Sequence, residues 1–219
     1  MIIPQVPSRG GIHYIWPGLQ PDSNNFVFQD VSGDEAVSGA WTFAEWMVAG
    51  SGDYNKTKDV LVYPGDSIAI CFALNPKTGR WLDRWETSPG AIGRAAGSMY
   101  SISDVIPPQE QTNAFGKLTQ ALFVIELVAG ATWNFGPVTF SKIKIVAETT
   151  TTEWCSSPGQ QAAFRFTIAN PVARVNGNTT YSIKWPKFGY GREERSTKLT
   201  PAFIPLQNSI EDFVAGDEL

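Results

Sequence analysis

The sequence is poor in the residues on which many enzyme active sites depend. Among 219 residues there is a single histidine, His13, and there are two cysteines, Cys71 and Cys155. A zinc site with several histidines needs more His than the chain has, and a Ser-His-Asp triad or a Cys-His dyad would depend on His13 alone, which does not readily supply it. Chemistry would therefore have to use carboxylates, amides and aromatic rings, and we expect neither a metal nor a cofactor. A disulfide between the two cysteines is compatible with the sequence but not required by it.

Charge is also scarce. Charged residues make up 17% of the chain and the formal net charge is −4, so there is no positive field to hold a polyanion, and we expect no nucleic-acid partner. The one basic cluster is interrupted by acidic residues, which is typical of a solvated loop. It consists of Arg192, Arg195 and Lys198 around Glu193 and Glu194.

Long apolar runs are missing as well. No stretch approaches the roughly twenty apolar residues of a membrane-spanning helix, and the first residues lack the features of a signal peptide. These observations predict a soluble chain without a membrane span, either secreted or cytoplasmic.

The sequence is rich in short β-type segments separated by turns. Runs of Val, Ile, Phe, Thr and Trp alternate with Gly, Pro and Asn turns about every ten residues, which predicts an all-β sandwich or barrel in one domain. The expected strands are 26–30, 41–48, 67–74, 80–86, 121–128, 138–147, 163–169 and 180–185. Turn chemistry predicts hairpins at Pro76 to Gly79 and at Asn176-Gly177. No convincing helix is expected; residues 1–206 would form the domain and 207–219 a tail.

Two glutamates lie in strands that are apolar on both faces. Glu45 lies in the strand 41–48 and Glu126 in the strand 121–128. A carboxylate in such a place is costly unless it is paired, protonated or open to water. The two could act as an acid and a base, or each could accept structural hydrogen bonds.

Other side chains are candidates for ligand contact. Trp81, Asp83 and Trp85 alternate along one strand and so share a face, where they would form either a sugar-stacking platform or part of the core. Gln20 and Gln29 are amides that could donate to a sugar hydroxyl or an oxyanion, although glutamines on loops usually do neither. His13, in the expected first strand, is interpreted as a hydrogen-bonded structural residue.

The order of several motifs resembles that of the fungal glutamic peptidases, the eqolisins, over about residues 11–187. The motifs are Trp16-Pro17-Gly18-Leu19, Phe26 to Gln29, Glu45-Trp46, Pro64 to Ile68, Ala121 to Glu126 and Phe135 to Phe140. The resemblance implies a concanavalin A-like double-sheet sandwich, a jelly roll with a concave face. It also implies peptide hydrolysis at acid pH by a Gln and Glu pair.

At the positions of that pair, this chain departs from the family pattern. The catalytic Gln corresponds to Asn24 or Asn25, and the catalytic Glu corresponds to Leu122, which cannot move a proton. The resemblance therefore implies that the peptidase dyad is lost, while Glu45, Trp46 and Glu126 match supporting family residues near the cleft.

The leading prediction is a lectin-like protein that binds a glycan or polysaccharide on its concave face. The expected ligand-binding residues are Gln20, Gln29, Trp41, Glu45, Trp81, Asp83, Trp85 and Glu126. One alternative is an acid hydrolase, either a peptidase with an altered dyad or a glycosidase, with Glu45, Glu126 and Gln29 as catalytic residues. Another is a structural or interaction protein, and exposed edge strands would allow a homodimer.

Overall fold

The structure is a computed structural model of the chain. It describes residues 1–8, 10–34, 38–52, 54–106, 116–156, 166–168, 172–177, 179–185, 188–190 and 202–205. The basic cluster at 192–198 and the expected tail at 207–219 lie outside the described residues.

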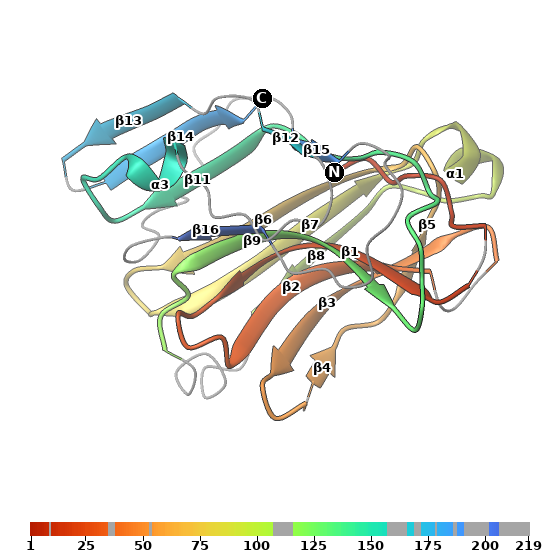
Figure 1. The fold of residues 1–219 in the computed structure, drawn as a ribbon, viewed down its shortest axis with the longest axis horizontal. Coiled ribbons are helices and arrows are strands. Elements are labelled where there is room, and N and C mark those ends of the chain that lie inside the picture. Colours follow the sequence, from red (N-terminus) through yellow and green to blue (C-terminus); the bar gives the residue numbers. More distant parts are fainter. Residues whose placement is uncertain are drawn as a thin grey trace.

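The larger of the two main layers, called the front sheet below, has the strand order β16-β9-β1-β2-β3-β4, with β5 also paired to β3 (Figure 1). All of its neighbouring strands are antiparallel. The strands are β1 (Ile12–Gln20), β2 (Phe26–Gly33), β3 (Trp41–Ala49), β4 (Tyr54–Lys56), β5 (Val60–Val62), β9 (Gln120–Val128) and β16 (Ala202–Pro205).

The second layer, called the back sheet, consists of two three-stranded parts joined by the start of the chain. Its parts have the orders β6-β7-β8 and β10-β15-β12, and Ile2 bridges them by pairing with Ser67 and Thr139. The strands are β6 (Ser67–Asn75), β7 (Arg80–Ser88), β8 (Ser101–Val105), β10 (Val138–Phe140), β12 (Phe166–Ile168) and β15 (Phe188–Tyr190).

The remaining elements lie beside these layers. A third sheet, at the upper left of Figure 1, has the order β11-β14-β13. Its strands are β11 (Ile143–Ala147), β13 (Val172–Asn176) and β14 (Thr179–Trp185), and the two short helices are α1 (Ala91–Ala95) and α3 (Glu153–Ser156).

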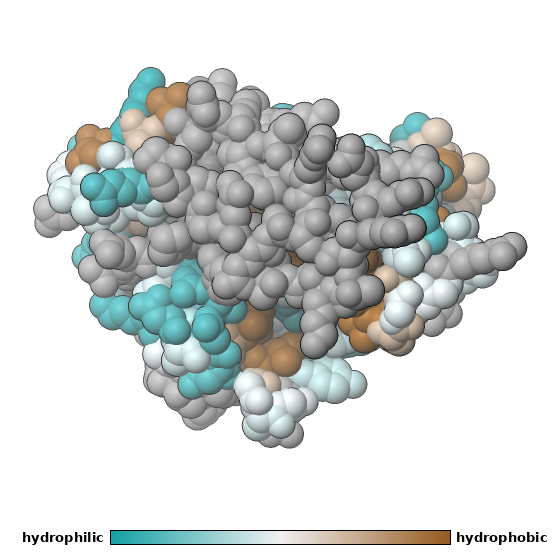
Figure 2. All heavy atoms as spheres, viewed as in Figure 1, coloured by the Kyte–Doolittle hydropathy of each residue, from teal (hydrophilic) through white to brown (hydrophobic). Residues whose placement is uncertain are grey.

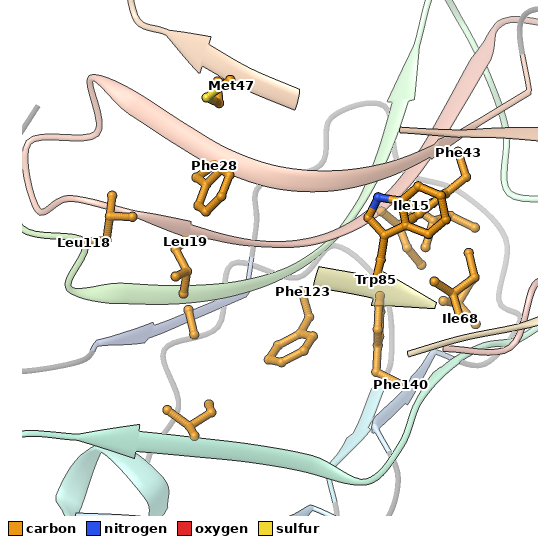
Figure 3. Packing of buried hydrophobic residues seen from close by; sticks show 14 of the residues in the cluster. Ile15, Leu19, Phe28, Phe43, Met47, Ile68, Trp85, Leu118, Phe123 and Phe140 are labelled. Atoms are coloured by element: carbon orange, nitrogen blue, oxygen red, sulfur yellow. The ribbon is translucent and has the colours of Figure 1, made fainter. Parts of the chain in front are cut away.

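The hydrophobic core lies between the front and back sheets, because alternate residues of each strand point inward. Edge-to-face aromatic pairs cross the gap: Phe28 with Phe72 at 5.1 Å, Phe43 with Trp85 at 5.2 Å, and Phe123 with Phe140 at 5.2 Å between ring centroids. Figure 3 shows Phe28, Phe43, Trp85, Phe123 and Phe140, which come from β2, β3, β7, β9 and β10. On the face seen in Figure 2, by contrast, the described residues are largely hydrophilic or neutral, with smaller hydrophobic areas.

The all-β sandwich predicted from the sequence is confirmed, and the long predicted strands occur near their expected bounds. The hairpin after Asn75 forms, with Gly79 N donating to Asn75 O at 2.8 Å, and Asn176 pairs with Thr179 across the second hairpin. The single strand expected at 138–147 is wrong: Lys142 has a φ of 56°, and this left-handed residue divides the run into β10 and β11.

The expectation of no helix is also wrong, since α1 and α3 each make about one helical turn. Both are too short to give a periodic apolar pattern, which explains why the sequence did not reveal them. No helix in the described ranges is long and apolar enough to cross a membrane. Cys71 is a free thiol.

The fold makes a prediction about two glycines with similar backbone angles, Gly11 at φ 82° and Gly39 at φ 83°. An added Cβ at Gly11 would overlap the backbone of Ala131, whereas one at Gly39 meets open space. Gly39→Ala should cost about 1 kcal/mol from the left-handed conformation alone, and Gly11→Ala more than about 2 kcal/mol because the backbone must also shift. Urea denaturation of both variants measures this; equal losses would contradict the packing at Gly11.

Candidate functional site

Alternation along β2 and β3 divides the polar residues of the front sheet between two faces. Asp30 pairs with Glu45 across these strands, and the next pair is Gln29 with Trp46. Asp30 and Glu45 point into the sandwich, so Gln29 and Trp46 point away from it. The structure therefore contains two distinct polar regions, one inside and one outside.

The inner region is a cluster of three carboxylic acids, called the acid cluster below. Asp30 on β2, Glu45 on β3 and Asp83 on β7 are all 0% exposed. None of their carboxyl oxygens accepts a hydrogen bond from a donor group of another described residue. The side chains of Asp30 and Asp83 do face each other as hydrogen-bonding partners across the two sheets. Because two carboxylates are both acceptors, that bond exists only when one of them carries a proton.

Burial dominates the electrostatics of the acid cluster. It raises the pKa of Glu45 to about 8, and the charge of Asp83 raises it further in the same direction. Burial also raises the pKa of Asp83, with the charge of Asp30 and their hydrogen bond adding to the effect. The pKa of Asp30 is raised by burial and by the charge of Glu45, and is partly lowered by the hydrogen bond to Asp83.

The acid cluster is sealed from any substrate in solution. A general acid or base has to reach a reacting group directly or through one water molecule, and these carboxyls are enclosed by the core. No group of three His, Cys, Asp or Glu side chains in the described ranges has the arrangement of a metal site. The cluster is therefore an internal titrating group, and a site for a ligand has to be sought on the outer face.

The outer face of the front sheet is formed by the side chains of β1, β2, β3 and β9 that point away from the core. Its centre is apolar and buried, with Trp16, Val31, Leu122 and Val124 packed together. Strand register places them side by side, because Trp16 pairs with Val124 and Gly18 with Leu122. Polar and aromatic residues surround this centre.

One side of the outer face carries a continuous group of aromatic rings, called the aromatic row. Tyr54 stacks on Trp46 at 5.4 Å with an interplanar angle of 17°, and Tyr14 meets Trp46 edge-on at 6.0 Å. Gly33 makes this possible, since a Cβ there would come within 3.0 Å of the Tyr14 ring. The ammonium of Lys56 lies 5.0 Å from the Trp46 ring centroid, a distance suited to a cation–π contact.

Amides gather at the end of the outer face where β1 and β9 pair. The Gln20 amide donates to Asn24 Oδ1 at 2.7 Å and to Gln120 Oε1 at 2.6 Å. Gln120 in turn donates to Asp22 Oδ1 at 3.3 Å. Gln29 differs from these amides, because its Oε1 is buried and has no partner among the described residues. Among the described amides of this face, Gln29 is therefore the one with a buried oxygen that accepts no hydrogen bond.

Glu126 lies at the opposite end of the outer face. Its side chain is exposed, and its Oε2 accepts a hydrogen bond from Trp16 Nε1 at 3.4 Å. Register places Glu126 opposite Tyr14. The carboxylate is thus open to solvent, in contrast to the sealed acids on the other side of the sheet.

The predicted site residues do not share one concave face. Gln20, Gln29 and Glu126 belong to the outer face, whereas the other five are buried in the core: Trp41, Glu45, Trp81, Asp83 and Trp85. The sugar platform expected on β7 is therefore wrong, because that face of β7 packs against the front sheet. The acid and base pair of Glu45 and Glu126 is wrong for a similar reason: the two carboxyls lie on opposite faces of the same sheet.

Two parts of the arrangement were missed in the sequence. In the sequence, Asp30 is only the last residue of the expected strand 26–30. The feature that identifies it is its position opposite Glu45 in the paired strands. Tyr54 lies in the three-residue strand β4, which is too short to show alternation. Neither pairing is visible without the three-dimensional fold.

His13 has the structural role expected of it. The ring is fully buried, with Nδ1 2.8 Å from Asp34 Oδ2 and Nε2 2.8 Å from the Thr132 carbonyl oxygen. Both ring nitrogens are thus engaged in holding β1 to two loops.

The positions that the resemblance assigns to a peptidase dyad carry no such pair. Leu122 is in the buried apolar centre, and Asn24 adopts a left-handed turn conformation with φ 55° while accepting from Gln20. On the described part of the outer face, Gln29 Oε1 has no hydrogen-bond partner, and the carboxylate of that face, Glu126, lies in a different cross-strand row.

A scan against protein-family models gives no match, and neither does a search of curated proteins. Among solved structures, the chain is similar to aspergilloglutamic peptidase from Aspergillus niger. The identity is 18%, the TM-score is 0.40, and the match covers 80% of this chain and 99% of the peptidase. The similarity is distant.

The corrected placement of the tryptophans makes a stability prediction. Trp85→Ala should lower the free energy of unfolding by about 3–5 kcal/mol, because it leaves a cavity against Phe43. Tyr54→Ala, at an exposed ring, should cost less than about 1 kcal/mol. Urea denaturation of both variants tests this. Equal stability of the two would show that Trp85 is a surface residue and would restore the platform on β7.

Proposed function

We propose that the outer face of the front sheet binds carbohydrate, with the aromatic row as its platform. The observation that carries this proposal is the row itself: Tyr54 is 61% exposed and stacks on Trp46, which contacts Tyr14. Stacking holds the Tyr54 ring in a fixed orientation while leaving it open to solvent. A rigid, exposed aromatic face of this kind packs against the C–H faces of a sugar ring.

Polar groups beside the row supply the second half of a sugar site. Gln29 is the cross-strand partner of Trp46, so an amide acceptor to which no described residue donates lies next to an aromatic ring. Gln29 Oε1 is itself buried, so a sugar hydroxyl would have to uncover it before donating to it, and the bond would then satisfy an acceptor that is costly to leave unpaired. Lys56, beside the same ring, provides a donor on the other side.

Binding fits the outer face better than hydrolysis does. Glu126 and Gln29 are the groups that could form a new dyad, but Glu126 pairs with Tyr14 and Gln29 with Gly18. Tyr14 and Gly18 are four residues apart on β1, so Glu126 and Gln29 are separated by roughly 13 Å along the strand direction, at about 3.3 Å per residue. Two groups so far apart cannot act together on one scissile bond, and Glu45 is not available on this face.

The test is a glycan array followed by calorimetry on the sugars retained. Tyr54→Ala should weaken binding at least tenfold, about 1.4 kcal/mol, because it removes the exposed ring. The matched control is Tyr100→Ala, an exposed tyrosine beside β8 in the back sheet, which should bind as tightly as the unmodified chain.

Three outcomes would overturn the proposal. Retention of no glycan would favour a structural or interaction role. Equal binding by Tyr54→Ala would place the site elsewhere. Cleavage of a protein or glycan at acid pH that disappears in Glu126→Gln would show a hydrolase in place of a binding protein.

A further inference from the structure

The acid cluster joins the two layers of the sandwich. Asp30 and Glu45 come from the front sheet and Asp83 from the back sheet, and the pairing of Asp30 with Asp83 crosses the core. Along each strand the inward neighbours are mainly apolar: Phe28 beside Asp30, Phe43 and Met47 beside Glu45, and Trp81 and Trp85 beside Asp83. The three acids are therefore a polar contact between sheets whose other inward residues around them are mainly apolar, the buried hydroxyl of Ser32 beside Asp30 being an exception.

No cation of the described residues faces the cluster from the strands packed around it. On β7, Arg84 points to the other side, where it contacts Glu86 at 3.4 Å and Asp104 of β8 at 3.7 Å. From β3 and β4, Lys56 lies over Trp46 and pairs with Asp59 at 2.9 Å.

Two further titratable groups lie on adjacent strands. His13 of β1 is held by Asp34. Cys71 of β6 is a thiol, and burial and the charge of Asp83 both raise its pKa; neither group gives the acid cluster a positive partner.

We propose that the acid cluster is a proton-dependent latch between the sheets: protons on its carboxyls hold β2 and β3 against β7, and loss of these protons as the pH rises above neutral loosens the sandwich there. Once Asp30 and Asp83 are both ionised, their hydrogen bond turns into a contact between like charges. Burial without counterions makes that contact strongly unfavourable.

The direction of the pH effect follows from linkage. The acid cluster keeps its protons in the folded chain at pH values where the unfolded chain has lost them, because the pKa of each acid is raised on folding. The folded state then binds more protons, so stability is greatest near the ordinary carboxyl pKa of about 4 and falls as pH rises. For Glu45 the fall extends to about pH 8, with the unfolding equilibrium constant rising up to about tenfold per pH unit for each acid.

The experiment is urea denaturation at intervals between pH 4 and pH 9. The unmodified chain should show an unfolding equilibrium constant that rises more than about a hundredfold from pH 5 to pH 8. Glu45→Gln should flatten this profile and should be relatively more stable at pH 8, since a neutral amide replaces an acid that would ionise. Asp104→Asn is the control, because this exposed acid on β8 should leave the slope unchanged.

A profile of the unmodified chain that is flat or rises from pH 5 to pH 8 would overturn the latch, and this result needs no variant to fold. If Glu45→Gln and Asp83→Asn both leave the dependence of unfolding stability on pH unchanged, the titrating groups lie elsewhere, and this would also overturn the latch. Hydrogen exchange at pH 5 and pH 8, corrected for intrinsic rates, should locate the loosening in 28–32, 43–47 and 81–85; loosening confined to other strands would contradict the proposal.

Discussion

Three carboxylic acids between two sheets, with no described cation facing them, impose the main physical constraint on this protein. Asp30, Glu45 and Asp83 are fully buried, and a buried carboxylate without a counterion is one of the costliest groups a fold can contain. Protonation removes most of that cost and creates the hydrogen bond between Asp30 and Asp83. The aromatic pairs around the cluster, such as Phe43 with Trp85, then pack against neutral groups. The closed sandwich and the protonated cluster thus depend on each other.

The same constraint directs function to the other side of the front sheet. Since the inner face of the front sheet is sealed, its described polar and aromatic groups are open to a partner on the outer face. Gln29 and Trp46 are the chain neighbours of Asp30 and Glu45 on β2 and β3, so the strands that hold the acids inside also hold the ligand-binding candidates outside. The absence of a side chain at Gly33 lets the Tyr14 ring reach across β2 to Trp46. The aromatic row is therefore a product of strand register as much as of composition.

The sequence predicted the architecture better than the site. Turn spacing and β-type segments were enough for the all-β sandwich, and the long strands β2, β3, β6, β7 and β9 were found because each is a run rich in β-type residues. The faces could not be assigned in the same way. Trp81, Asp83 and Trp85 do share a face, as alternation requires, but alternation cannot tell whether that face meets solvent or a second sheet.

Glu45 and Glu126 were misassigned for a related reason. Alternation shows which residues of one strand share a face, but only the register between strands shows whether Glu45 and Glu126 lie on the same face of the sheet. For Glu45 the sequence left three options, which were pairing, protonation and exposure to water, whereas Asp30, its cross-strand partner, could be identified only in the paired sheet.

The central claim is that the acid cluster is protonated in the folded protein well above the ordinary carboxyl pKa. Infrared difference spectroscopy between the unmodified chain and Glu45→Gln at pH 6 measures this directly, because a protonated carboxyl and a carboxylate absorb at separate frequencies. The structure predicts that the band lost with Glu45 is that of a protonated carboxyl, in agreement with its pKa of about 8. Loss of a carboxylate band at that pH would show that Glu45 is ionised in the folded chain, and would contradict the account of a core closed by shared protons.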